Sequence, residues 1–323
     1  MKTMVDLTGP IAADLQRTVG IFDEEVRSDL PFLNRLLDQV RSYRGKLLRP
    51  KLLLLSGKAT GDLRQEHVVL AAVVEMVHMA TLVHDDVLDE ADVRRRSPTV
   101  NMTWGNEGAV LLGDYLISHS YHLCSSLGST QASRRIAAVT NTICEGELMQ
   151  IEHRGDFTLS EATYLEIIRR KTAALTSICC DLGAATSGAG VEVIENMAAF
   201  GRDIGIAFQI VDDLLDLTAT ESEIGKTVGR DAELGKLTLP LIRFLDQAGP
   251  QERHRLLAIL SDTDANKTEQ ILLVLNGSDA MDYAMAMARS YIQSAVAQLS
   301  GLPAGDAKDA LIAAAEFVLQ RRQ

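Results

Sequence analysis

Apolar residues recur along most of the chain at intervals of three and four positions, which is the period of an amphipathic α-helix. Prolines and clusters of glycine and polar residues interrupt this pattern, and no segment shows convincing strand alternation. We predict an all-α protein whose roughly 12–13 helices form a single domain over 1–323. The predicted helices cover residues 10–28, 31–42, 46–59, 65–90, 106–128, 131–152, 160–187, 191–218, 236–246, 252–261, 266–275, 278–300 and 305–321.

Two of the predicted helices, 65–90 and 191–218, are apolar on nearly every side. Because such a helix must be covered all round, both are expected at the centre of a bundle. Residues 246–323 carry no cluster of polar groups, and we predict that they form outer helices with a structural role only.

Both central helices end in the pattern Asp-Asp-x-x-Asp, at Asp85, Asp86 and Asp89 and again at Asp212, Asp213 and Asp216. In the first helix, the period places Asp85 and Asp89 on one stripe with His78, Thr81 and Leu82. Unpaired carboxylates cost several kcal/mol each to bury, so they must meet a cation or water. One motif alone could be an ordinary acidic helix end, but two copies predict a facing pair of metal-binding walls.

The ligands in these motifs are carboxylate oxygens, without the histidine or cysteine that zinc favours. Mg²⁺ fits best, because it binds one or two carboxylates, keeps water, and completes its octahedron with phosphate oxygens. His84 stands beside Asp85 but points about 100° away from the carboxylate stripe, so we interpret it as a packing or supporting residue. Two such walls with bound metal would hold a polyanion, and a diphosphate is suitable.

Basic residues lie close to both motifs in sequence. Taken singly, each is an ordinary solvated cation, but their joint placement beside acidic helix ends favours diphosphate binding. They are Lys46 and Arg49 at a helix start, the run Arg94, Arg95 and Arg96, Lys171 with Thr172, and Lys226 and Lys236, each of which follows a glycine.

Composition narrows the class of protein further. The net charge of −12 argues against general affinity for nucleic acid or anionic lipid. The four cysteines, Cys124, Cys144, Cys179 and Cys180, show no metal-binding spacing and are expected to be buried thiols. The first residues lack an apolar signal core, and no run approaches the roughly 20 apolar residues of a membrane span. These features predict a soluble cytoplasmic protein.

With these residues in view, the chain resembles the trans-isoprenyl diphosphate synthases, also called polyprenyl synthases. The resemblance runs from about Gly45 to Pro240 and rests on ordered motifs. These are Gly45-Lys46-x-x-Arg49-Pro50, Asp85-Asp-x-x-Asp89 followed by Arg94-Arg95, Gly113-Asp114-Tyr115, Lys171-Thr172, Phe208-Gln209-x-x-Asp212-Asp-x-x-Asp216, Gly225-Lys226 and Gly235-Lys236-Leu-Thr. Arg96 departs from the pattern, because relatives commonly have glycine there.

The resemblance implies a bundle around a deep central cavity, usually a homodimer, that joins isopentenyl diphosphate to an allylic diphosphate. It implies catalytic roles for Asp85, Asp86, Asp89, Lys171 and Asp212. It implies that three Mg²⁺ ions are bound with substrate by Asp85, Asp89 and Asp212, supported by Asp86, Asp213 and Asp216. The allylic diphosphate would contact Arg94, Lys171, Thr172, Gln209, Lys226 and Lys236. Isopentenyl diphosphate would contact Lys46, Arg49, His78 and Arg95.

In such enzymes the product tail grows below the first acidic motif. The residues at this place are Val77, Ala80 and Thr81, and none is bulky. From Asp85 back to Glu66 the helix extends roughly 28 Å, which leaves room for many isoprene units. We therefore predict a product longer than twenty carbons, made from farnesyl or geranylgeranyl diphosphate and then passed to a membrane.

Four other interpretations of the function remain open. A medium-chain, geranylgeranyl-type synthase would have the same motifs. The chain could instead be the catalytic subunit of a heteromeric prenyl synthase, whereas a non-catalytic subunit would have lost its aspartates. A class I terpene cyclase would normally replace the second motif with an Asn/Ser/Glu metal motif. A metal-dependent phosphohydrolase would release phosphate without isopentenyl diphosphate.

Overall fold

A computed structural model describes residues 8–218, 229–262 and 266–320, and these form an all-α bundle. The elements are η1 (Gly9–Ile11), α1 (Ala12–Glu25), α2 (Pro31–Ser42), α3 (Leu48–Thr60), α4 (Gln65–Leu88), β1 (Val93–Arg94), β2 (Ser97–Pro98), α5 (Val100–Ser125), α6 (Thr130–Glu152), α7 (Glu161–Ile168), η2 (Arg169–Ala173), α8 (Ala174–Ser187), α9 (Val191–Thr218), α11 (Arg230–Glu233), α12 (Leu239–Gln247), α13 (Pro250–Ser261), α14 (Lys267–Leu275), α15 (Ala280–Gln298) and α16 (Asp306–Gln320).

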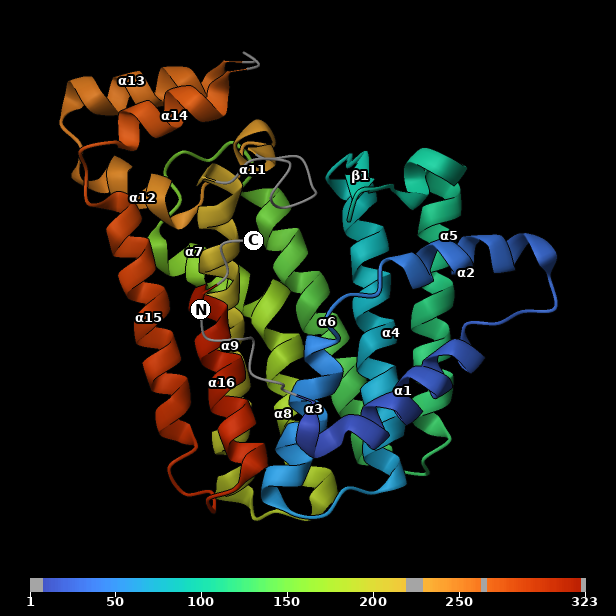
Figure 1. Ribbon diagram of the computed structural model, residues 1–323. Coiled ribbons are helices and arrows are strands. Elements are labelled where there is room, and N and C mark those ends of the chain that lie inside the picture. The colour runs from blue at the N-terminus through green and yellow to red at the C-terminus, as the bar shows by residue number, and fades with distance from the viewer. Residues whose placement is uncertain (1–7, 219–228, 263–265, 321–323) are drawn as a thin grey trace.

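The two helices predicted to be central, α4 and α9, are buried along most of their length. α4 packs against α3 and α5, and α9 packs against α8 and α15. α15 and α16 lie along one side of the bundle, α1 and α2 cross the other side, and α13 and α14 pack together at one end (Figure 1). By length and composition, α4 is the one described helix that could cross a membrane, but 78% of its most apolar window is buried by neighbouring helices.

The segment predicted as one helix over 160–187 is interrupted in the structure. α7 ends at Ile168, the five residues Arg169–Ala173 form a π-helix, and α8 continues from Ala174. Gly146 on α6 permits this, because a Cβ atom there would lie 2.5 Å from the backbone nitrogen of Lys171. π-helical turns are rare and often occur at functional sites.

A short hairpin follows the first acidic motif, where no strand was predicted. Val93 pairs with Pro98 and Arg94 pairs with Ser97. The two residues of the turn, Arg95 and Arg96, have φ angles of 53° and 65°. Two-residue hairpin turns need positive φ, which glycine adopts most easily. Glycine at position 96 would adopt this angle without a steric cost.

Candidate active site

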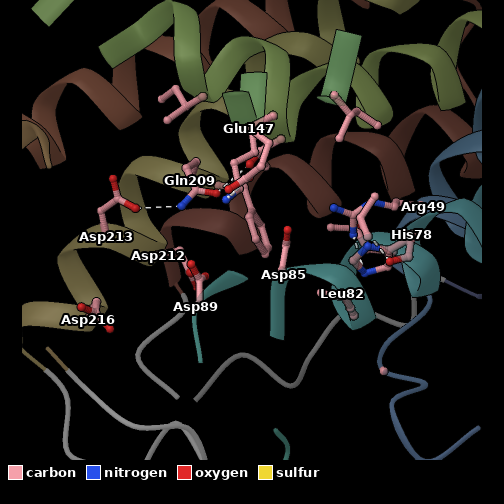
Figure 2. A pocket seen from close by; sticks show the side chains of 18 of the residues that line it. Arg49, His78, Leu82, Asp85, Asp89, Glu147, Gln209, Asp212, Asp213 and Asp216 are labelled. Atoms are coloured by element: carbon pink, nitrogen blue, oxygen red, sulfur yellow. Dashed lines mark hydrogen bonds and ion pairs between the residues drawn. The ribbon is translucent and has the colours of Figure 1, made fainter. Parts of the chain in front are cut away.

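A cavity of about 1590 Å³ lies between the ends of α4 and α9 and is lined by both acidic motifs (Figure 2). It exceeds the roughly 300–1,000 Å³ that is usual for small-molecule sites. Five of the six predicted metal-binding aspartates line it: Asp85, Asp89, Asp212, Asp213 and Asp216. The fold therefore brings together two motifs that are far apart in sequence.

Asp86 is placed differently from the other five. Its side chain is 0% exposed, and it accepts a hydrogen bond from Nε of Arg94 over 2.7 Å. Burial raises the pKa of Asp86, although the charge of Arg94 acts in the opposite direction. Asp86 therefore does not line the cavity. It holds Arg94 in position, and Arg94 lines the cavity.

Asp89 is surrounded by basic side chains. Lys236 donates to its Oδ1 over 2.8 Å, and Arg154 donates to the same oxygen over 3.4 Å. Burial acts to raise the pKa of Asp89, but the charges of Lys236 and Lys171 outweigh it, so that the pKa is lowered. Arg230 on α11 donates to the backbone carbonyl of Asp89 over 2.8 Å. These contacts tie residues 230–236 to the end of α4.

In the second motif, Asp213 and Asp216 are buried and Asp212 is half-buried. Asp213 accepts hydrogen bonds from Tyr164 and Gln209 at 2.6 and 2.7 Å. Burial and the nearby charge of Asp231 raise the pKa of Asp213 to about 8.

The π-helix directs Lys171 and Thr172 into the cavity. Lys171 forms an ion pair with Glu147 and donates to Gln150 over 2.8 Å. Thr172 donates to Gln209 over 2.8 Å. Burial acts to lower the pKa of Lys171, but the carboxylates of Asp85 and Glu147 outweigh it and raise the pKa. Lys171 and Thr172 thus lie beside both acidic motifs, as the sequence predicted.

A second group of basic residues lines the cavity around Arg49. Its Nη1 lies 2.9 Å from Nε2 of His78, and its buried Nε has no hydrogen-bond partner within the described residues. Burial, followed by the charges of nearby arginines, lowers the pKa of His78 well below its usual value, so its imidazole is neutral at pH 7. Lys46 and Arg95 line the same part of the cavity. Four predicted isopentenyl-binding residues are therefore brought together.

The sequence did not single out several residues that line the cavity. These residues are Glu75, Glu147, Gln150 and Tyr164, and none of them belongs to a motif in the sequence. The sequence marked acidic and basic clusters, but single polar residues on a helix face resemble surface residues until the fold is known.

Some predictions about the outer parts of the site were wrong. The last helix is not only structural, because α16 lines the cavity with Ala313, Ala314, Glu316, Phe317, Val318 and Gln320. Cys144 is exposed and lines the cavity, instead of being a buried thiol. Val77 and Ala80 are fully buried against neighbouring helices and do not line the cavity, whereas Thr81 does. Lys226 lies outside the described residues.

Comparisons with known proteins agree with this arrangement. A family model described as polyprenyl synthetase matches residues 30–276. Heptaprenyl diphosphate synthase component 2 of Bacillus subtilis (strain 168) is 37% identical over 301 residues, which cover 93% of this chain and 86% of that protein. Octaprenyl diphosphate synthase of Escherichia coli (strain K12) is 33% identical, and the match covers 99% of this chain and 97% of that protein.

A solved structure shows the same fold. The polyprenyl synthase of Caulobacter crescentus CB15, described in complex with calcium and isoprenyl diphosphate, superposes with a TM-score of 0.92 and is 32% identical. The superposition covers 98% of this chain and 97% of that one. From the matched residues and the cavity they form, the chain belongs to the polyprenyl synthetase family.

Proposed function

We propose that the protein is a magnesium-dependent prenyltransferase that condenses isopentenyl diphosphate with an allylic diphosphate and makes a long all-trans polyprenyl diphosphate. The observation that carries this proposal is the cavity between α4 and α9, which two acidic motifs and two groups of basic side chains line together. Such a site suits two diphosphates, one at each basic group.

The residues present fit magnesium. The donors are carboxylate oxygens, and within the described residues no three His, Cys, Asp or Glu side chains gather into a ready-made metal site. A magnesium ion would therefore take some ligands from diphosphate oxygens and water. Asp85, Asp89 and Asp212 would hold the ions, with Asp213 and Asp216 behind them. Bound magnesium would neutralise the departing diphosphate as a Lewis acid.

The protein's own groups would assist each step. Lys171 and Lys236 stabilise the negative charge that develops as the allylic C–O bond breaks and its electron pair leaves with the diphosphate. Arg49 and Lys46 orient isopentenyl diphosphate, whose double bond then attacks the allylic carbon to form the new C–C bond. A proton passes to the released diphosphate, and the product is one isoprene unit longer. The apolar cavity wall excludes water, which would quench the cation.

The long product follows from the cavity wall formed by α4, α5 and α6. Thr81, Ile117, Ile143 and Thr140 line it, and none of the lining residues on these three helices is Phe, Tyr or Trp. Thr140 precedes Glu147 by seven residues, which is roughly 10 Å along the helix axis. The cavity thus continues well below Lys171, with no bulky side chain from these helices to end it.

The proposal is tested by incubating the purified protein with MgCl₂, farnesyl diphosphate and labelled isopentenyl diphosphate, followed by mass analysis of the products. We expect prenyl diphosphates longer than twenty carbons, and none when MgCl₂ is omitted. Products that stop at twenty carbons would show a medium-chain synthase instead. A cyclic hydrocarbon would indicate a terpene cyclase, and phosphate release without isopentenyl diphosphate would indicate a phosphohydrolase.

We further propose that the protein acts in the cytoplasm as a homodimer that passes its product to a membrane. Exposed apolar side chains on α5 support an interface there, and they are Met102, Val110 and Leu111. We expect sedimentation of Leu111→Glu and Val110→Glu variants to show monomers. Val191→Glu, which changes an exposed apolar residue on α9, is the control.

A heteromeric synthase is the second candidate, because the relative from Bacillus subtilis is named as component 2 of its enzyme. In that case the present chain would be the catalytic subunit. Activity of the chain expressed alone decides between the two. Full activity supports the homodimer, and no activity until a second kind of subunit is added supports the heteromer.

A further inference from the structure

Tyr164 is a buried residue on α7 whose hydroxyl group reaches the second acidic motif. Its side chain is 3% exposed, and its Oη donates to Oδ2 of Asp213 over 2.6 Å. A tyrosine hydroxyl in a buried position needs a hydrogen-bond partner, and a carboxylate is a strong one. The contact therefore joins α7 to α9 at the level of the predicted metal ligands.

Asp213 is held from its other side as well. Its Oδ1 accepts a hydrogen bond from Nε2 of Gln209 over 2.7 Å (Figure 2). Oε1 of Gln209 accepts a hydrogen bond from Thr172 over 2.8 Å. Because the Gln209 amide has one bond at each end, its orientation is fixed. A continuous chain of hydrogen bonds thus runs from Thr172 through Gln209 and Asp213 to Tyr164.

This series of hydrogen bonds gives Asp212 and Asp213 different roles. Successive residues of a helix point about 100° apart, so Asp213 can turn towards α7 while Asp212 lies in the cavity wall. Without the Tyr164 hydroxyl group, a buried carboxylate oxygen of Asp213 would lose its donor. Asp213 would then compete for other donors and cations, and the Gln209 amide would lose its fixed orientation.

We propose that Tyr164 is a positioning residue that holds Asp213 and Gln209 in the arrangement in which the second acidic motif receives magnesium and the allylic diphosphate. This role rests on the proposed function. It concerns the allylic substrate only, because within the described residues neither Lys46 nor Arg49 is hydrogen-bonded to Thr172, Gln209, Asp213 or Tyr164.

The experiment compares Tyr164→Phe with the unmodified protein. We expect the half-saturating concentration of MgCl₂ and the KM for farnesyl diphosphate to rise about tenfold, since the hydrogen bond that holds Asp213 is lost. The KM for isopentenyl diphosphate should not change. Tyr283→Phe is the matched control, because Tyr283 also donates to a carboxylate on α7, that of Glu161 over 2.9 Å, but does not line the cavity.

A calorimetric measurement needs no turnover. Titration of MgCl₂ with inorganic diphosphate into the protein should give a dissociation constant about tenfold higher for Tyr164→Phe than for the unmodified protein. If the unmodified protein forms no prenyl product, the proposed function fails, but this titration still decides the role of Tyr164.

Asp213→Asn provides the coupling test. If Tyr164 acts through Asp213, adding Tyr164→Phe to Asp213→Asn should change magnesium binding by less than about twofold. A full tenfold loss in that background would overturn the proposal, as would equal losses in Tyr283→Phe or no loss in Tyr164→Phe. If Tyr164→Phe does not fold, Asp213→Asn alone must show the weakened magnesium binding, and unchanged binding overturns the proposal.

Discussion

The ammonium group of Lys46 lies 4.9 Å from the centre of the Phe317 ring. Lys46 precedes α3, whereas Phe317 belongs to the last helix, and both line the cavity. A cation this close to an aromatic face is attracted by roughly 0.5–1 kcal/mol at an exposed site. The last helix therefore restrains a residue that is predicted to bind isopentenyl diphosphate.

Replacing Phe317 by Leu should weaken isopentenyl diphosphate binding, because the variant keeps an apolar side chain but removes the aromatic face. Since Lys46 would be less well positioned, we expect the KM for isopentenyl diphosphate to rise about two- to fivefold. The KM for the allylic substrate should stay the same in steady-state kinetics. Leu319→Ala on the same helix does not line the cavity and serves as the control. A lower KM in Phe317→Leu would mean that Phe317 competes with the substrate for Lys46.

Gly146→Ala tests whether the π-helix is needed for activity. The added Cβ would lie 2.5 Å from the Lys171 nitrogen and 2.8 Å from Cβ of Arg170, so the π-helix would have to move. We expect the free energy of unfolding to fall by about 1–3 kcal/mol. We expect kcat/KM for the allylic substrate to fall at least about tenfold, because a small displacement of catalytic groups is costly.

The control for this variant is Gly20→Ala on α1, where no atom lies within 4 Å of the added Cβ. Denaturant unfolding should show that Gly20→Ala is as stable as the unmodified protein or more so, because alanine favours a helix by up to about 1 kcal/mol. If Gly146→Ala kept full activity, the position of Lys171 would not depend on this close approach.

The sequence predicted the helices well where one period runs without interruption. The bounds of 191–218 match α9, and both acidic motifs lie at helix ends as expected. It did not predict the π-helix, because one extra residue in a turn leaves the apolar pattern nearly unchanged. The reason for that turn is the contact between Gly146 and Lys171, which exists only after α6 and η2 have packed together. Similarly, nothing in the sequence joins Tyr164 to Asp213.

The proposal that the product is long is tested by comparing two variants, one at a residue that lines the cavity and one at its neighbour, which does not. Thr81→Phe should shorten the products, because Thr81 lines the cavity one turn below Asp85. Ala80→Phe should instead destabilise the protein by about 1–3 kcal/mol, because Ala80 is fully buried in helix packing. Mass analysis of the products and denaturant unfolding measure both effects. Products of unchanged length from Thr81→Phe would contradict the assigned path of the tail.

Because Arg96 has a positive φ angle in the hairpin turn, we expect Arg96→Gly to make the protein more stable. Arg96 has a φ angle of 65°, which costs a residue with a Cβ about 1–2 kcal/mol, and glycine avoids this cost. Glycine also has more freedom in the unfolded chain, which offsets about 0.5–1 kcal/mol. We therefore expect the free energy of unfolding, measured with denaturant, to rise by up to about 1.5 kcal/mol, with kcat unchanged. A loss of stability would show that the Arg96 side chain contributes more than its backbone costs.

Glu75 should make stability depend on pH in a defined direction. Burial raises its pKa from 4.5 to about 7, although the charges of Arg49 and Arg95 act to lower it. Because the folded state then binds more protons than the unfolded state between pH 4.5 and 7, stability decreases as the pH rises through this window. The loss is complete about one pH unit above the folded-state pKa.

Glu75→Gln removes this titration. Between pH 6 and pH 8, the unmodified protein should therefore lose roughly 1 kcal/mol more unfolding free energy than the variant. Urea unfolding at the two pH values measures the difference. Glu66→Gln, at an exposed position in the first turn of the same helix, should behave like the unmodified protein. Equal losses in Glu75→Gln and the unmodified protein would mean that Glu75 ionises in the folded state at its ordinary pKa, with the arginines compensating fully for its burial.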